Sequence, residues 1–146
     1  MRAKAVLAGG LAAALLAAGA DAAPARHLVN GVNVLEPLTI GGAEPFWGAT
    51  VKGSRVIWSD PEHERLIGKV GRPRLTPDSA TWRGTVSRLG AFTLTLTPAE
   101  ECSDGMSDYT FPLEATVAFR EYTYRGCAGT QEAFARARKR SEGMVR

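Results

Sequence analysis

Seven consecutive residues, CSDGMSD from Cys102 to Asp108, bring a cysteine, two serines, two aspartates and a glycine close together in the chain. Aspartates can bind Ca²⁺, but the ligand spacing and the bidentate glutamate of an EF-hand loop are missing here. A serine nucleophile is typical of G-x-S-x-G or S-x-x-K, and the chain contains neither motif. Paired carboxylates serve glycoside hydrolases, yet two aspartates four residues apart on a loop are common. All three patterns are weak, and we expect no catalytic residue and no metal site in this stretch; a cation bound by Asp104 and Asp108 is the alternative.

The same stretch has the residue types of a turn. Asp104-Gly105 favours a tight turn because glycine adopts a positive φ without steric cost. Ser103, Ser107 and Asp108 have short polar side chains that accept hydrogen bonds from nearby backbone N–H groups. Met106 has no role in this interpretation. The candidate functional loop therefore comprises Ser103, Asp104, Gly105, Met106, Ser107 and Asp108.

The chain has two cysteines, Cys102 and Cys127, and we expect them to form a disulfide. Closing a loop of about 26 residues would stabilise the fold by about 3.5 kcal/mol in the chain-entropy model. A catalytic thiol is the alternative, and it requires a histidine partner. Neither His27 nor His63 has a sequence context typical of such a partner.

Glu44, Pro45, Phe46 and Trp47 form a second candidate motif, EPFW. The proline restricts Glu44 to extended backbone, and Phe46 and Trp47 point to opposite faces of a strand that begins here. One of the two rings should therefore enter the core. We expect the carboxylate of Glu44 to close one end of the fold through an ion pair with an arginine; the alternative is that it faces a ligand.

No motif for a cofactor or a structural metal stands out. The segment HERLI begins like the zinc-protease motif H-E-x-x-H, but Ile67 takes the position of the second histidine. No glycine-rich phosphate loop is present. We expect no cofactor, and we interpret the three tryptophans as core or rim packing rather than as a sugar-stacking platform: Trp47, Trp58 and Trp82.

Short extended runs separated by turn residues predict an all-β fold between residues 37 and 129. In AFTLTLTP, Phe92, Leu94 and Leu96 alternate with threonines, as in a strand with one buried face. In FPLEATVAFR we expect one apolar face, formed by Phe111, Leu113, Ala115, Val117 and Phe119. About seven or eight such strands predict a small antiparallel β-barrel, lipocalin-like, in preference to a sandwich because closure removes exposed edges.

The two ends of the chain differ from this central part. Residues 1–22 have the cationic start, apolar run and A-x-A site of a cleavable signal peptide, and residues 23–36 form an irregular lead-in with an NGVN turn. Residues 130–146 form a basic, polar tail that is helical in composition, with Thr130 as its cap. The apolar run is too short to span a membrane comfortably, so we expect a periplasmic or secreted protein with no transmembrane span in the mature chain.

Several of these motifs together resemble a group of small bacterial envelope proteins. The resemblance covers about Gly41 to Ala128 and rests on GGAEPFW, LTLTP, CSDGMSD, YTFP and the closing GCA. Members of this group are lipoprotein-type sequences of unestablished activity, and some occur beside META-type or lysozyme-inhibitor-like domains. The resemblance implies an exported, barrel-like domain. This chain departs from lipoprotein members because no lipobox cysteine follows its apolar run.

These observations favour an exported protein that is not an enzyme and that acts as a protein-interaction module. The partner would be an envelope protein. Binding of a small apolar ligand in a barrel cavity is one alternative, and a lysozyme-inhibitor-like activity is another. We expect no nucleic-acid partner, since the formal net charge of +3 includes two cations of the signal segment and an exported protein rarely meets nucleic acid.

Overall fold

Runs of alternating apolar and polar residues form the strands of one large antiparallel sheet in the computed structural model, which describes residues 3–5, 9, 19, 23, 25–106 and 108–144. The elements are β1 (Leu28–Val29), β2 (Val32–Asn33), β3 (Leu38–Ala43), β4 (Phe46–Lys52), β5 (Arg55–Asp60), β6 (His63–Val70), β7 (Arg74–Thr76), β8 (Ser79–Val86), β9 (Gly90–Ser103), β10 (Thr110–Phe119), β11 (Thr123–Thr130) and α1 (Gln131–Met144).

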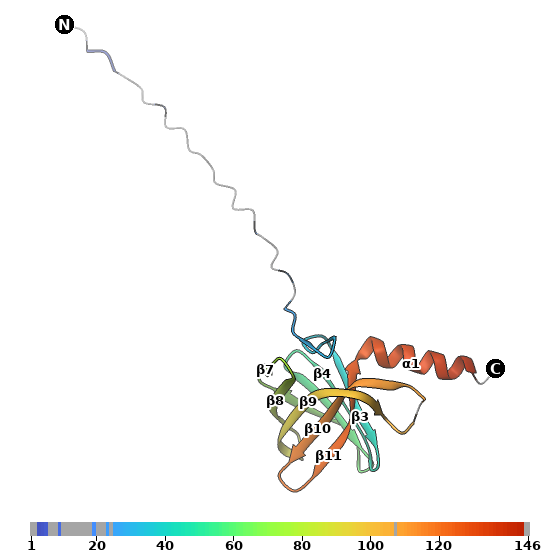
Figure 1. The fold of residues 1–146 in the computed structure, drawn as a ribbon. Coiled ribbons are helices and arrows are strands. Elements are labelled where there is room, and N and C mark those ends of the chain that lie inside the picture. Colours follow the sequence, from blue (N-terminus) through green and yellow to red (C-terminus); the bar gives the residue numbers. More distant parts are fainter. Residues whose placement is uncertain are drawn as a thin grey trace.

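Eight of these strands close into a barrel (Figure 1). The order around it is β6-β5-β4-β3-β11-β10-β9-β8, and β6 pairs with β8 to complete the ring. The short strand β7 pairs with the first residues of β8 and stays outside the ring. The predicted small antiparallel barrel is therefore confirmed, with eight strands.

The barrel core follows the predicted alternation. Phe92, Leu94 and Leu96 are buried, whereas the threonines between them are partly exposed on the outside. On β10, Leu113, Ala115 and Val117 are buried in the same core, and Phe119 packs against it. Phe111 does not belong to this row, contrary to our expectation. A bulge between Phe111 and Leu113 turns its ring into a second, smaller cluster with Cys127.

Side chains fill the barrel interior. Valine, alanine and aromatic side chains from β4, β5, β8, β9 and β10 leave a space of about 10 Å³ between them. Such a space is no larger than one water molecule, and its walls are apolar. We therefore do not place a ligand inside the barrel core.

The lead-in contains a minimal hairpin that covers one end of the barrel. Asn30 and Gly31 both have positive φ, 47° and 78°, as a two-residue hairpin turn requires. Val29 and Val34 are buried in the barrel core. The side-chain amide of Asn30 donates to the carbonyl oxygen of Pro112 at 2.8 Å, which ties the hairpin to β10.

The polar tail forms α1, at the same end of the barrel as the lead-in (Figure 1). Thr130 Oγ1 accepts a hydrogen bond from the amide of Ala133 at 3.1 Å, and Glu132 forms an ion pair with Arg136 at 3.4 Å. In the described part of the chain, no helix is both long and apolar enough to cross a membrane. Most of residues 1–22 lie outside the described residues, so the signal peptide stays a prediction.

Candidate functional site

The predicted disulfide joins the end of β9 to β11. The Cα atoms of Cys102 and Cys127 are 5.6 Å apart, within the reach of a disulfide. Cys127 is fully buried and packs with Phe111 on the outside of the barrel wall. The ring of Phe134 from α1 stacks on Phe111 with a centroid distance of 3.9 Å. The disulfide therefore anchors a small external core that fixes both the β9–β10 loop and α1 to the barrel.

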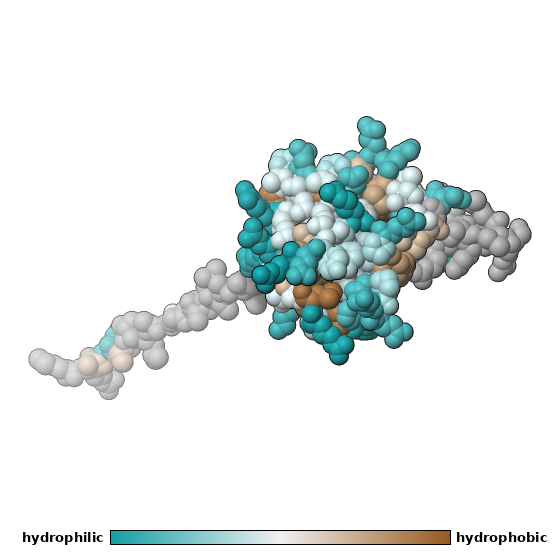
Figure 2. All heavy atoms as spheres, turned by 90° about the horizontal axis from the view of Figure 1, so that it is seen from below, coloured by the Kyte–Doolittle hydropathy of each residue, from teal (hydrophilic) through white to brown (hydrophobic). Residues whose placement is uncertain are grey.

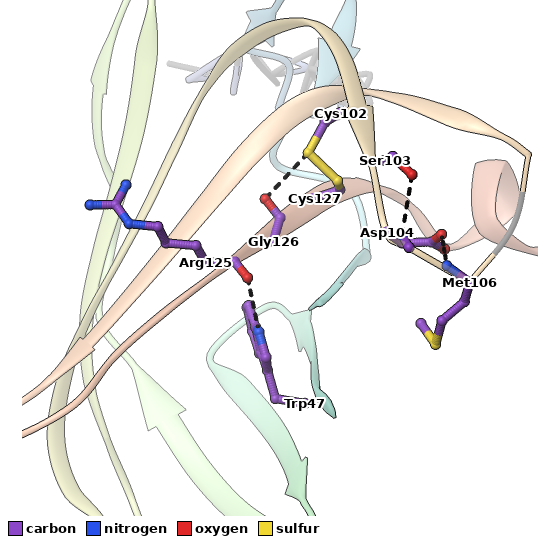
Figure 3. The surroundings of a disulfide bond; sticks show 9 residues. Trp47, Cys102, Ser103, Asp104, Met106, Arg125, Gly126 and Cys127 are labelled. Carbon is purple, nitrogen blue, oxygen red and sulfur yellow. Dashed lines mark hydrogen bonds between the residues drawn. A yellow bond between two sulfur atoms is a disulfide. The ribbon is translucent and has the colours of Figure 1, made fainter. Parts of the chain in front are cut away.

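The loop after Cys102 is held by its own short side chains (Figure 3). Ser103 Oγ accepts a hydrogen bond from the amide of Gly105 at 3.2 Å, and Asp104 Oδ1 accepts one from the amide of Met106 at 2.9 Å. Gly105 has a φ of +72°, which favours glycine. Asp104 is buried, whereas Asp108 is exposed, and Ser107 lies outside the described residues. The side chain of Met106 points away from the disulfide (Figure 3).

The structure brings this loop against the EPFW turn, although 60 residues separate them in sequence. A Cβ atom on Gly105 would lie 3.0 Å from the Cβ of Ala43, which pairs with Phe46 across the turn. Met106 and Phe46 are exposed beside this contact, at 57% and 52%. Thus the segments of two predicted motifs contact each other, and we call their exposed residues together the anchor face: Glu44, Phe46, Gly105, Met106 and Asp108.

Glu44 does not have the expected structural role. It lies in the turn between β3 and β4, next to a cis peptide bond to Pro45, and it is exposed. Among the described residues no ion pair includes Glu44. Its carboxylate is instead part of the anchor face, where it is available to solvent.

Trp47 is the ring of the EPFW motif that enters the core, and it is 1% exposed. Its indole Nε1 donates to the carbonyl oxygen of Arg125 at 3.1 Å (Figure 3). Any Cβ on Gly42 would lie 2.6 Å from this Nε1 and 2.5 Å from that oxygen. The glycines of GGAEPFW therefore allow the indole to reach across to β11. Cys102 Sγ also lies 3.4 Å from the carbonyl oxygen of Gly126, a van der Waals contact because a disulfide sulfur carries no proton.

The surroundings of the anchor face are acidic. Glu100, Glu101 and Asp108 are exposed on and beside the loop, and Glu44 adds a fourth exposed carboxylate from the adjacent turn. The stretch 99–119 contains no lysine and no arginine. These two segments thus carry two exposed apolar side chains and four exposed carboxylates.

A second polar cluster, which the sequence analysis missed, lies at the opposite end of the barrel from α1. Asp60 Oδ2 accepts a hydrogen bond from Trp58 Nε1 at 2.7 Å, and Oδ1 accepts one from the amide of Glu62 at 2.9 Å. His63 Nδ1 lies 2.9 Å from the same Oδ1. Burial raises the pKa of Asp60, but the hydrogen bonds from Trp58, His63 and Glu62 together outweigh it, so the pKa lies below its ordinary value of 3.8.

This cluster holds a turn and orders the aromatic rings behind it. Trp58 stacks on Trp47 with a centroid distance of 5.2 Å, and Tyr124 lies edge-on to Trp58 at 5.0 Å. Burial first, and then the negative charge of Asp60, raise the pKa of Tyr124 above 10.0. Because both oxygens of Asp60 are engaged by groups of its own hairpin, we assign the carboxylate a structural role. The sequence signal was an aspartate two residues after a tryptophan and three before a histidine.

Neither a metal-binding group nor a related protein identifies the function of this site. Within the described residues there is no group of three or more histidine, cysteine, aspartate or glutamate residues that could hold a metal ion. Comparisons of the chain with family models, curated proteins and solved structures gave no match.

Proposed function

We propose that this chain is an exported protein of the bacterial cell envelope that binds a protein partner through the anchor face and is not an enzyme. The N-terminal signal pattern and the resemblance to envelope proteins support export. The disulfide is consistent with an oxidising compartment, such as the periplasm or the exterior of the cell. Because side chains fill the barrel core, we expect the partner to bind the protein surface.

The observation that carries the proposal is that two exposed apolar side chains lie on segments that are held against each other. Phe46 and Met106 sit on turns that contact each other through Ala43 and Gly105. The disulfide and the hydrogen bonds of Ser103 and Asp104 hold the loop in place. Preorganised anchors lower the entropy cost of binding, and buried apolar anchors carry most of the energy of many interfaces.

Charge favours a basic partner. Exposed carboxylates lie on the same turn and loop as the anchors or close to them in sequence: Glu44, Glu100, Glu101 and Asp108. Complementary charge accelerates association and disfavours acidic partners. A lysozyme with a basic surface fits this chemistry, and the resemblance to proteins found beside lysozyme-inhibitor-like domains favours the same class. Inhibition of such an enzyme is the specific form of the proposal.

The test compares wild-type protein with the double variant Phe46→Ser/Met106→Ser. Envelope proteins retained by the immobilised wild type are identified, purified and titrated directly, and a basic lysozyme is titrated in parallel. We expect the double variant to bind the partner about 30-fold more weakly or worse, since buried anchors contribute at least about 2 kcal/mol. Binding should also weaken as salt is raised.

The matched control is Ile67→Ser, which removes another exposed apolar side chain, 43% exposed, on β6. This variant should retain wild-type affinity. Equal binding by wild type and the double variant would overturn the anchor face. Lysozyme inhibition that survives the double variant would overturn the lysozyme form of the proposal.

A further inference from the structure

A pocket opens at one mouth of the barrel, apart from the anchor face. It has a volume of about 400 Å³, within the range of small-molecule sites, which often lie in the mouths of β-barrels. The lead-in, the β4–β5 turn and the segment after β6 form its walls. Apolar side chains line its inner part and two charged residues stand at its rim: Val34, Val51, Val70 and Trp82 inside, Glu36 and Arg72 outside.

Trp82 differs from the other two tryptophans. The indole N–H groups of Trp47 and Trp58 donate to a backbone carbonyl and to a carboxylate. Trp82 is only 3% exposed, and among the described residues its indole N–H has no hydrogen-bond partner. No buried side-chain nitrogen of the described residues is left unpaired, so this N–H keeps some contact with solvent. Trp82 is also one of the residues that line the pocket.

An indole N–H without an acceptor in the protein can donate a hydrogen bond to an oxygen atom of a ligand. Buried tryptophan N–H groups usually find an acceptor, and a lone donor among apolar walls gives a ligand both affinity and orientation. We propose that the mouth pocket binds a small molecule with an apolar body and one hydrogen-bond-accepting oxygen, which Trp82 Nε1–H contacts.

Two charged residues at the rim of the pocket influence which oxygen-containing group of a ligand would bind. Arg72 is exposed and adds a positive charge at the opening, which would favour a carboxylate. Glu36 lies at the same rim and accepts a hydrogen bond from Asn33 Nδ2 at 3.2 Å, so its negative charge partly offsets that of Arg72. Carboxylates and uncharged amides or esters share the acceptor oxygen, and the experiment separates them.

The experiment follows the indole N–H signals of the ¹⁵N-labelled full chain by nuclear magnetic resonance, with each signal assigned from its Trp→Phe variant. Sodium hexanoate and hexanamide are titrated separately to about 10 mM, which detects even weak sites of millimolar affinity. We expect a saturable shift of the Trp82 signal, with the Trp47 and Trp58 signals unmoved. The Trp82→Phe variant lacks one hydrogen bond to the ligand, so its affinity for the probes should fall about tenfold. Because it also lacks the indole signal, its binding is measured from the backbone amide signals of Val51 and Val70.

Each outcome decides one point. Binding of both probes supports the site and assigns recognition to the acceptor oxygen alone. Binding of hexanoate that falls in Arg72→Gln, with no binding of hexanamide, supports the site and assigns it to carboxylates. No saturable shift with either probe, equal shifts of all three indoles, or unchanged affinity in Trp82→Phe would overturn the proposal. None of these results depends on the anchor face, because the two sites share no residue.

Discussion

At the scale of single residues, Asp60 makes the clearest contribution to stability. Its side chain is 6% exposed and accepts hydrogen bonds from Trp58 Nε1 and from the amides of Glu62 and His63. Hydrogen bonds to a charged group contribute about 1.5–3 kcal/mol. We therefore expect Asp60→Ala to lower the free energy of unfolding by about 2 kcal/mol at neutral pH, measured by urea denaturation.

The pKa of Asp60 predicts how this difference depends on pH. Since its folded pKa is below the ordinary value of 3.8, the stabilisation is present above pH 3.8 and is lost as pH falls through the lower, folded pKa. The difference between wild type and Asp60→Ala should thus shrink in that acidic window. Asp78→Ala, at an exposed position in the β7–β8 turn, is the control and should change little. A difference that is constant down to the lowest pH would contradict this assignment.

Gly42 is needed because it has no side chain, which leaves room for the hydrogen bond between Trp47 and Arg125. A Cβ there would meet the carbonyl oxygen of Arg125 and the indole nitrogen of Trp47 at 2.5 and 2.6 Å. We expect Gly42→Ala to destabilise the protein by about 1–3 kcal/mol, as overpacking does. Gly48→Ala, in the same hairpin, meets its nearest neighbour at 3.5 Å and should be tolerated. Thermal unfolding of the two variants would compare them, and equal melting temperatures would contradict the close approach.

At the scale of elements, the disulfide decides whether the β9–β10 loop stays on the barrel. We expect Cys102→Ala/Cys127→Ala to lower the free energy of unfolding by about 3 kcal/mol, given the sequence separation of 25 residues. Amide exchange should rise in residues 104–110 and in α1, because Phe111 and Phe134 rest on the same small core. A reductant should destabilise the wild type and leave the double variant unchanged. Rapid exchange that spread evenly over all strands would contradict a local role.

Local sequence patterns predicted the strands and their buried faces, but they did not predict which elements contact one another. The alternation in AFTLTLTP predicted which face of β9 is buried, and the chain's two cysteines left one intramolecular pairing. Phe111 left its predicted row because the bulge beside Pro112 changes the direction of the side chain, which periodicity alone cannot reveal. The contact between Gly105 and Ala43, and the burial of Val29 and Val34 by the lead-in, depend on distant segments that no local pattern identifies.

At the scale of the whole molecule, the surface rather than the interior offers room for binding. The barrel core is filled, and on the face seen in Figure 2 apolar areas are small and separated by polar ones. The two proposed sites lie on different elements: the anchor face on the β3–β4 turn and the β9–β10 loop, the pocket at the lead-in mouth. The pocket depends on barrel closure because its lining includes Val70 from β6 and Trp82 from β8, the two strands that close the ring. The anchor face depends instead on the disulfide and on the hydrogen bonds of its loop.

Closure depends on the pairing of β6 with β8, and two glycines permit it. Gly68 pairs with Val86 and Gly84 with Val70, and a Cβ on either glycine would collide with the backbone carbonyl of Thr85 or of Lys69. Neither strand can retreat without losing the hydrogen bonds that complete the ring. We expect Gly84→Ala to lower the free energy of unfolding by about 2 kcal/mol and to raise amide exchange first in β6 and β8, measured by mass spectrometry.

Gly71→Ala is the matched control for the seam, by which we mean the pairing of β6 with β8. A Cβ on Gly71 would come no closer than 3.8 Å to another residue, the carbonyl oxygen of Arg83. This variant should exchange like the wild type. If Gly84→Ala also did so, the seam would tolerate a side chain and the strands would have to be spaced more widely than the structure has them. If Gly84→Ala instead opened β6 and β8 alone, the remaining strands would behave as an open sheet with two free edges, which is the state that closure prevents.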